Sequence, residues 1–240
     1  MVFALISSLI CWIAFGIFVF GLLFKLISYF RSPEPFKIPL TPGPSTSTGV
    51  FFKIFRYIFF FEPLIKTRFW LWFWSMGFHI CFLLVILRHL RYFIYPVPSW
   101  IMALQTPGIY AGYGLLVFSI LLVGYRLLSD RRVYLSILED YVMIALFLGL
   151  AGTGLWLKYA NRLFLVDLKA FTLGLVTFNP APPPLDALFL IHLLLVIALF
   201  AYFPFGKLLH VLGVFMNPTI QQRDDVRIRR HINPWDIEVE

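Results

Sequence analysis

Residues 191–210 read IHLLLVIALFAYFPFGKLLH, and this stretch decides the class of protein. A helix of about 20 mainly apolar residues is long enough to cross the hydrocarbon core of a bilayer. The stretch also carries two histidines, His192 and His210, with Pro204 between them. Ionisable side chains are costly inside a membrane, so their presence there indicates a functional site.

The composition of the whole chain is that of a membrane protein. Charged residues make up only 13% of the 240 residues, against about 25% in an average soluble domain. Four further stretches are long and apolar enough to cross a bilayer. The sequence therefore predicts an all-α membrane protein, a bundle of five transmembrane helices. The predicted spans are residues 2–29, 69–95, 108–128, 141–159 and 185–214.

The basic residues predict the orientation of this bundle. With the N-terminus outside and the C-terminus in the cytoplasm, 14 of the 20 Lys and Arg residues fall on the cytoplasmic side and five outside, while Lys25 lies within the first span. This asymmetry follows the positive-inside rule and accounts for the net charge of +8 without a nucleic-acid partner. The predicted organisation is helix 1 (1–30), a cytoplasmic linker and interfacial helix (31–67), a four-helix core (68–214) and a cytoplasmic tail (215–240).

Four of the five histidines lie in the second and fifth spans, and His231 lies in the tail. On an ideal helix, His79 and His89 are separated by about 15 Å of rise and lie within roughly a quarter turn of each other, whereas His192 and His210 are five turns and about 27 Å apart. Because these spans run in opposite directions, His79 matches His210 near the cytoplasm, and His89 matches His192 near the outer face. Two axial imidazoles on facing helices suit a six-coordinate haem iron. We therefore predict an inner and an outer b haem.

Several neighbours fit this interpretation. The unequal rises require helix tilt or a kink at Pro204. Gly77 and Gly206 are expected to let a porphyrin approach the backbone. Three basic residues lie near the ligands and are predicted to pair with haem propionates, or else to extend to the interface: Arg88, Arg91 and Lys207.

Other classes of site are less well supported. Zinc prefers a tetrahedral cluster with thiolate or carboxylate ligands, and Cys11 and Cys81 stand alone in apolar runs. A transporter with a proton relay would need more membrane carboxylates. A haemless anchor whose histidines hydrogen-bond between helices stays open as an alternative. No catalytic nucleophile or base is predicted on the chain itself.

Residues 68–214 resemble the cytochrome b (gamma) subunit of respiratory nitrate reductase. That family has two His ten apart in its second helix, as in FHICFLLVILRH, and two His eighteen apart in its fifth, as in HLLLVIALFAYFPFGKLLH. The segments IYAGYGLL and LEDYVMIALFLGLAGTGL are also similar. The resemblance implies that the four histidines are axial ligands of two haems.

Three segments are closer to another branch, the DsrM-type cytochrome b: EPLIKTRFWLWFWSMGFHICFLLVILRHLRYF, RRVYLSILEDY and DDVRIRRHINPWD. That protein is the membrane subunit of the sulfite-reductase-associated, heterodisulfide-reductase-like (Hdr-like) menaquinol-oxidising complex of sulfur-metabolising prokaryotes. The resemblance implies a multi-pass protein of the cytoplasmic membrane with menaquinol as substrate. It also implies a cytoplasmic Hdr-like iron–sulfur subunit, a periplasmic multihaem cytochrome c and further membrane subunits as partners.

One departure from the nitrate reductase pattern concerns the quinol site. That branch has a quinol-binding lysine before the third helix, where this chain has Thr106. We therefore expect menaquinol to contact Thr106, Arg91 or Tyr110. The tail, with Trp235 as an apolar anchor, is expected to dock on a cytoplasmic subunit. The predicted function is electron transfer from menaquinol to that subunit, and the reverse, quinone-reducing direction stays open.

Overall fold

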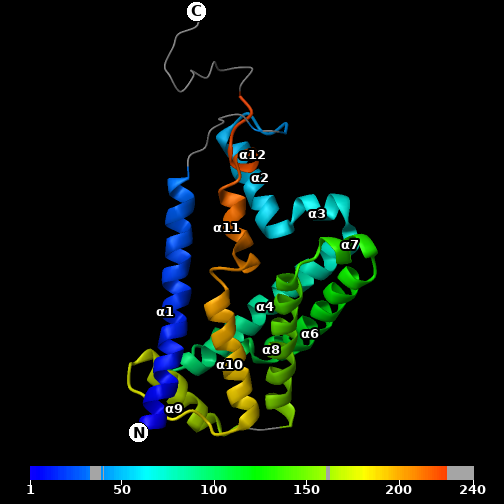
Figure 1. Cartoon of the computed structure of the whole chain (residues 1–240). Coiled ribbons are helices and arrows are strands. Elements are labelled where there is room, and N and C mark those ends of the chain that lie inside the picture. The colour runs from blue at the N-terminus through cyan, green and yellow to red at the C-terminus, as the bar shows by residue number, and fades with distance from the viewer. Residues whose placement is uncertain (33–38, 40, 161–162, 226–240) are drawn as a thin grey trace, which may run out of the picture.

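The computed structural model describes residues 1–32, 39, 41–160 and 163–225, and every regular element in these ranges is a helix (Figure 1). Four helices are long and apolar enough to cross a membrane: α1 (Val2–Arg31), α4 (Phe69–Phe93), α6 (Gln105–Leu127) and α8 (Leu138–Tyr159). The shorter elements are α2 (Ser47–Phe60), α3 (Glu62–Thr67), α5 (Ser99–Ala103), α7 (Asp130–Leu135), α9 (Leu165–Val176), α10 (Ala187–Tyr202), the 3₁₀ turn η1 (Lys207–Leu209), α11 (His210–Phe215) and α12 (Pro218–Gln221). The all-α prediction and its first four spans are confirmed as long apolar helices.

The fifth predicted span is not one continuous helix. The 16-residue helix α10 ends before Pro204, which has no backbone N–H to continue the helical ladder. The chain resumes as η1 and then as α11, of which His210 is the first residue. The ideal-helix geometry of five turns between His192 and His210 is therefore wrong, whereas the expected disruption at Pro204 is confirmed. Because His192 and His210 lie in separate helices, the helical repeat does not determine the direction of one from that of the other.

The four long helices and α10 pack in the order α4, α6, α8, α10 and α1. The buried residues of α1 are all small, namely Ala4, Ser8, Ala14 and Gly21. Helices in a membrane associate through close packing at small residues, because lipid supplies no hydrophobic driving force between them. Gly21 receives the buried ring of Pro204, since a Cβ at Gly21 would lie 2.6 Å from the proline Cγ. Helix α1 therefore packs directly on the break after α10.

Helices α6 and α8 each bury one stripe of residues spaced three or four apart, as expected for helices that pack along one face. In α6 the stripe is Gly108, Ala111, Leu115 and Ser119. In α8 it is Asp140, Ile144, Phe147 and Ala151. The charged member of these stripes, Asp140, lies in the first turn of α8, directly before the predicted start of that span.

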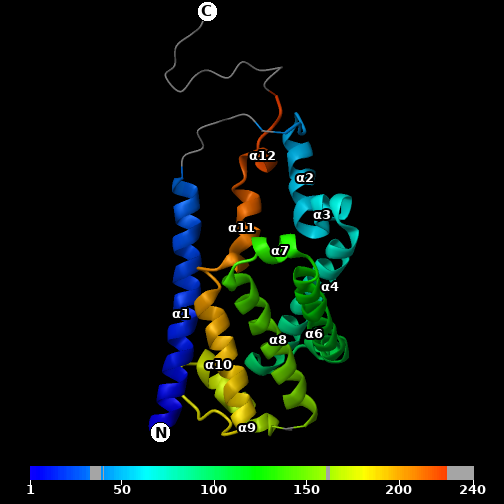
Figure 2. The same cartoon turned by 45° about the vertical axis from the view of Figure 1, so that its right-hand side comes forward.

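The two ends of the bundle carry different elements. Figures 1 and 2 place Met1 and α9 at one end, and α2, α3, α7, α11 and α12 at the other. Helix α9, which the sequence analysis did not predict, is tied to α1 by a 2.9 Å hydrogen bond from the Trp12 indole to the Leu175 carbonyl. It is tied to α4 by a 2.6 Å bond from the Thr172 hydroxyl to the Tyr92 carbonyl.

The opposite end joins the linker to the start of the tail. The Lys53 ammonium donates to the Thr219 carbonyl at 3.0 Å, and the Gly43 amide donates to the Asp224 carboxylate at 3.1 Å. Both views show α2 roughly parallel to α1 (Figures 1 and 2). The predicted docking anchor Trp235 and the tail histidine His231 lie outside the described residues.

Candidate haem-binding site

Helix α4 carries His79 and His89, and its own backbone orients both rings. Nδ1 of His79 lies 2.7 Å from the Ser75 carbonyl oxygen, and Nδ1 of His89 lies 2.6 Å from the Val85 carbonyl oxygen. A carbonyl can only accept, so each Nδ1 carries the proton. Nε2 of each ring therefore keeps its lone pair, which is the arrangement of a metal-ligating histidine.

The two histidines of the α10–α11 segment follow the same pattern. Nδ1 of His210 lies 3.0 Å from the Lys207 carbonyl oxygen. Nδ1 of His192 lies 2.7 Å from the Thr153 hydroxyl of α8. Because that hydroxyl donates to the Gly149 carbonyl at 2.6 Å, it accepts the His192 proton. Among the described residues, each of these four histidines thus has Nδ1 engaged and shows no hydrogen bond at Nε2.

The inner pair, His79 and His210, meets across the bundle. Their ring centroids are 5.9 Å apart and their planes cross at 84°. Imidazole nitrogens bind a transition metal at about 2 Å, so two rings on opposite sides of one ion have centroids about 6 Å apart. Rings of Phe61 and Phe78 flank His79 at 5.0 and 5.4 Å. This donor set fits an iron with two axial imidazoles.

The predicted outer pair consists of His89 on α4 and His192 on α10. His192 packs closely on α8, where a Cβ at Gly154 would lie 3.3 Å from its Cε1 atom. Beside His89, the buried Nε of Arg88 has no hydrogen-bond partner in the part of the chain that the structure describes. A buried guanidinium nitrogen of this kind fits an anionic group such as a haem propionate.

An acidic pair at the start of α8 holds the segment before His210. Asp140, which is 3% exposed, accepts from the Lys207 ammonium at 2.8 Å and from the Arg126 guanidinium at 3.2 Å. Glu139 accepts from the Tyr202 hydroxyl at 2.6 Å and from the Lys207 backbone N–H at 3.0 Å.

A family model for the nitrate reductase gamma subunit matches residues 64–227, a range that contains all four of these histidines. The chain belongs to the nitrate reductase gamma subunit family. Two relatives are Hdr-like menaquinol oxidoreductase cytochrome b-like subunits. The one from Archaeoglobus profundus is 31% identical over 94% of this chain and 81% of its own length. The one from Archaeoglobus fulgidus is 31% identical over 98% of this chain and 85% of its own length.

Membership of the gamma subunit family confirms the nitrate reductase resemblance inferred from the histidine spacings. Together with the four long apolar helices, it identifies the chain as an integral membrane protein. No group of three or more His, Cys, Asp or Glu that could hold a metal ion occurs among the described residues.

Two glycine predictions made for this gamma-like core are wrong. A Cβ at Gly77 would collide with the ring of Phe118, and a Cβ at Gly206 would collide with the ring of Tyr202. The space beside each glycine is therefore filled by an aromatic ring of the chain itself. The ring beside Gly77 comes from α6, and the ring beside Gly206 comes from the end of α10.

The structure brings together only some of the residues predicted near the outer end. Arg91 donates a hydrogen bond to Gln105 at the start of α6, and its guanidinium lies 5.4 Å from the centroid of the Tyr92 ring. Thr106 is exposed on the same turn as Gln105, and Tyr110 is 71% exposed. Gln105, which the sequence analysis did not single out, is thus the polar partner of Arg91.

The sequence analysis also missed Thr153, Phe61 and the role of the acidic pair. The LEDY segment that begins α8 was a usable signal, because two adjacent carboxylates at the edge of a membrane span need cationic partners. The predicted propionate partner Lys207 is one of the two cations that bind Asp140.

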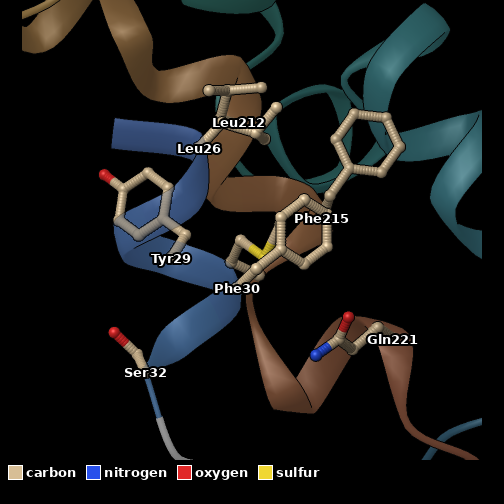
Figure 3. Close-up of a pocket in the computed structure, with 8 residues that line it drawn as sticks. Leu26, Tyr29, Phe30, Ser32, Leu212, Phe215 and Gln221 are labelled. Carbon is tan, nitrogen blue, oxygen red and sulfur yellow. The ribbon is translucent and has the colours of Figure 1, made fainter. Parts of the chain in front are cut away.

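A cavity of about 450 Å³ lies between the last turns of α1 and the segment α11–α12 (Figure 3). Its lining is mostly apolar, with Tyr29, Ser32 and Gln221 as its polar members. None of the four histidines lines it. The cavity is therefore distinct from both histidine pairs of this gamma-family core.

Proposed function

We propose that this chain is the dihaem cytochrome b subunit of a menaquinol-oxidising complex of the Hdr-like, DsrM type. The observation that carries the proposal is the shared state of the four membrane histidines. Each has Nδ1 engaged by an oxygen, and His79 and His210 lie close together across the bundle. Helices that only needed interhelical hydrogen bonds would have no reason to leave every Nε2 unused.

When bound, two b haems would supply one-electron carriers between menaquinol at the outer face and an iron–sulfur subunit in the cytoplasm. In this proposal His79 and His210 hold the inner haem iron, and His89 and His192 hold the outer one. Arg88 is the propionate partner of the outer haem, and Lys207 is that of the inner haem. The segment α10–α11 completes a fifth span, with the N-terminus outside.

Menaquinol is proposed to bind near the outer pair, at the junction of α4 and α6. There the Gln105 carbonyl oxygen and the Arg91 guanidinium form an acceptor and a donor side by side. Thr106 and Tyr110 flank this pair on α6. A quinol hydroxyl can donate to the amide oxygen, and the protons of menaquinol would leave on the outer side.

The relatives' names point to an Hdr-like complex, so the proposed partners are its other subunits. These are a cytoplasmic Hdr-like iron–sulfur subunit, a periplasmic multihaem cytochrome c and further membrane subunits. The proposed location is a prokaryotic cytoplasmic membrane, and the proposed setting is sulfur metabolism. The chain would supply the electron-transfer part of a menaquinol:acceptor oxidoreductase.

The test is a reduced-minus-oxidised spectrum of the purified protein with pyridine haemochrome quantitation, beside four single His→Ala variants. We expect two b haems in the parent chain. The His79 and His210 variants should lose the same haem, and the His89 and His192 variants the other. A colourless, intact parent protein purified with haem supplied would reject the proposal in favour of a haemless anchor. Stopped-flow mixing with menaquinol then distinguishes oxidation from quinone reduction.

A further inference from the structure

Lys207 lies in the break after α10 and is held at two points by adjacent residues of α8. Glu139 accepts its backbone N–H at 3.0 Å, and Asp140 accepts its ammonium at 2.8 Å. Glu139 also accepts the Tyr202 hydroxyl at 2.6 Å, so it bridges the end of α10 and the start of η1. Two carboxylates of α8 therefore fix both the backbone and the side chain of one residue that lies far along the chain.

The carbonyl of Lys207 is the group that orients His210, at 3.0 Å from Nδ1. His79 and His89 take their acceptors from the interior of α4, and His192 takes its acceptor from α8. The acceptor of His210 lies instead in a three-residue turn, η1, that is separated from α10 by the Pro204 break. A short turn of this kind needs an external anchor to hold one orientation.

The α8 side of this anchor is itself rigid. The carboxylate of Asp140 also binds the Arg126 guanidinium at 3.2 Å and accepts the Ile137 backbone N–H at 3.1 Å, which caps the first turn of α8. Asp140 is buried, and both of its oxygens are engaged. Asp140 therefore ties the position of Lys207 to the first turn of α8.

We propose that Glu139 and Asp140 are positioning residues for the inner haem. They fix Lys207, and the Lys207 carbonyl fixes the rotation and tautomer of the His210 imidazole. This inference rests on the proposed role of His210 as an axial ligand. It requires that substitutions in the acidic pair change the EPR signal and the midpoint potential of the inner haem and leave the outer haem unchanged.

The test compares Glu139→Met with Glu139→Gln in the full-length protein loaded with haem. Methionine has a similar length and removes the acceptor, whereas glutamine removes the charge and keeps an oxygen that can accept from Lys207 and Tyr202. We expect Glu139→Met to shift the EPR signal and the midpoint potential of the inner haem and to lower its occupancy. Glu139→Gln should restore the inner-haem EPR signal to the parent position. The outer-haem signal should stay unchanged in both variants.

A matched control is Glu62→Met, because Glu62 also bridges two cations but makes no bond to the segment that carries His210. It should leave both haem signals in place. Lys207→Met tests the second arm, since it keeps the backbone groups and removes the ammonium that binds Asp140 and, in the proposed function, an inner-haem propionate. We expect a smaller shift of the inner haem alone. Unchanged inner-haem signals in both Glu139→Met and Lys207→Met would overturn the inference, as would equal shifts for Glu139→Met and Glu139→Gln. A parent protein without haem would instead overturn the proposed function.

Discussion

The imidazole rings of His79 and His210 lie nearly perpendicular to each other, with centroids 5.9 Å apart and planes at 84°. His79 lies in the middle of a long helix, and His210 begins a short one after a break. Their orientations are fixed by two different carbonyls, those of Ser75 and Lys207. The near-perpendicular arrangement therefore follows from two separate backbone segments.

The first prediction concerns the electronic structure of the inner haem. Perpendicular axial imidazoles keep two d orbitals of a ferric iron close in energy, so we expect a highly anisotropic low-spin EPR signal. The measurement is low-temperature EPR of the oxidised His89→Ala variant, in which only the inner haem should remain. A rhombic spectrum typical of parallel imidazole planes would contradict the geometry seen for His79 and His210.

The second prediction concerns Thr153, the hydrogen-bond acceptor of His192. Accepting the Nδ1 proton gives the imidazole more anionic character and stabilises ferric iron. Thr153→Val should therefore raise the midpoint potential of the outer haem. A net hydrogen bond of about 0.5–1.5 kcal/mol corresponds to roughly 20–60 mV for one electron. Redox titration of the haem absorption bands measures this shift. Thr153→Ser keeps the hydroxyl and should restore the parent potential, and the inner-haem potential should not move.

The sequence predicted the parts of this molecule that depend on local pattern. The long apolar runs located α1, α4, α6 and α8, because each span must satisfy its own backbone hydrogen bonds in lipid. Counting residues between histidines, with antiparallel helices, was enough to match His79 with His210, which the structure brings together. Both inferences need only the helical repeat and the direction of each span.

The remaining features depend on contacts between distant segments. The predicted span began at residue 141, after Glu139 and Asp140, because carboxylates are costly in a membrane. In the structure both residues lie in the first turn of α8, where Lys207 and Arg126 neutralise Asp140. The end of α10 could be suspected from Pro204, but the orientation of the following turn is set by α8. In the sequence Thr153 is a single hydroxyl in an apolar helix, and its role follows only from the position of His192 beside it in the structure.

The third prediction concerns Glu62, which lies outside the long apolar helices. Hydrogen bonds from Lys66 and then Arg56 hold the pKa of Glu62 below its ordinary value. Its contribution to stability is therefore fully present above the ordinary pKa of about 4.3 and is lost as the pH falls through the lowered value. We expect Glu62→Gln to lower the thermal midpoint slightly at pH 7, because exposed ion pairs are screened by solvent.

That difference in thermal midpoint should shrink as the pH falls below the ordinary pKa of about 4.3 and through the lowered pKa of Glu62. It should also shrink at pH 7 in high salt. Circular dichroism melts of both proteins in the same detergent supply the comparison. A difference that grew as the pH fell would contradict the assigned direction of the Glu62 pKa.

The last prediction concerns the contact between α1 and the break after α10. A Cβ at Gly21 would lie 2.6 Å from Cγ and 2.7 Å from Cβ of the fully buried Pro204. Neither the helix backbone nor the proline ring can yield easily, so Gly21→Ala should cost about 1–3 kcal/mol. Gly16, on the same helix, has open space where a Cβ would lie, with no atom within 4 Å, so Gly16→Ala should be neutral or slightly stabilising through helix propensity. Thermal melts of the two variants give the comparison, and haem absorbance during the melt reports whether the segment leading to His210 moves first. Equal midpoints for the two variants would show that α1 does not pack on Pro204.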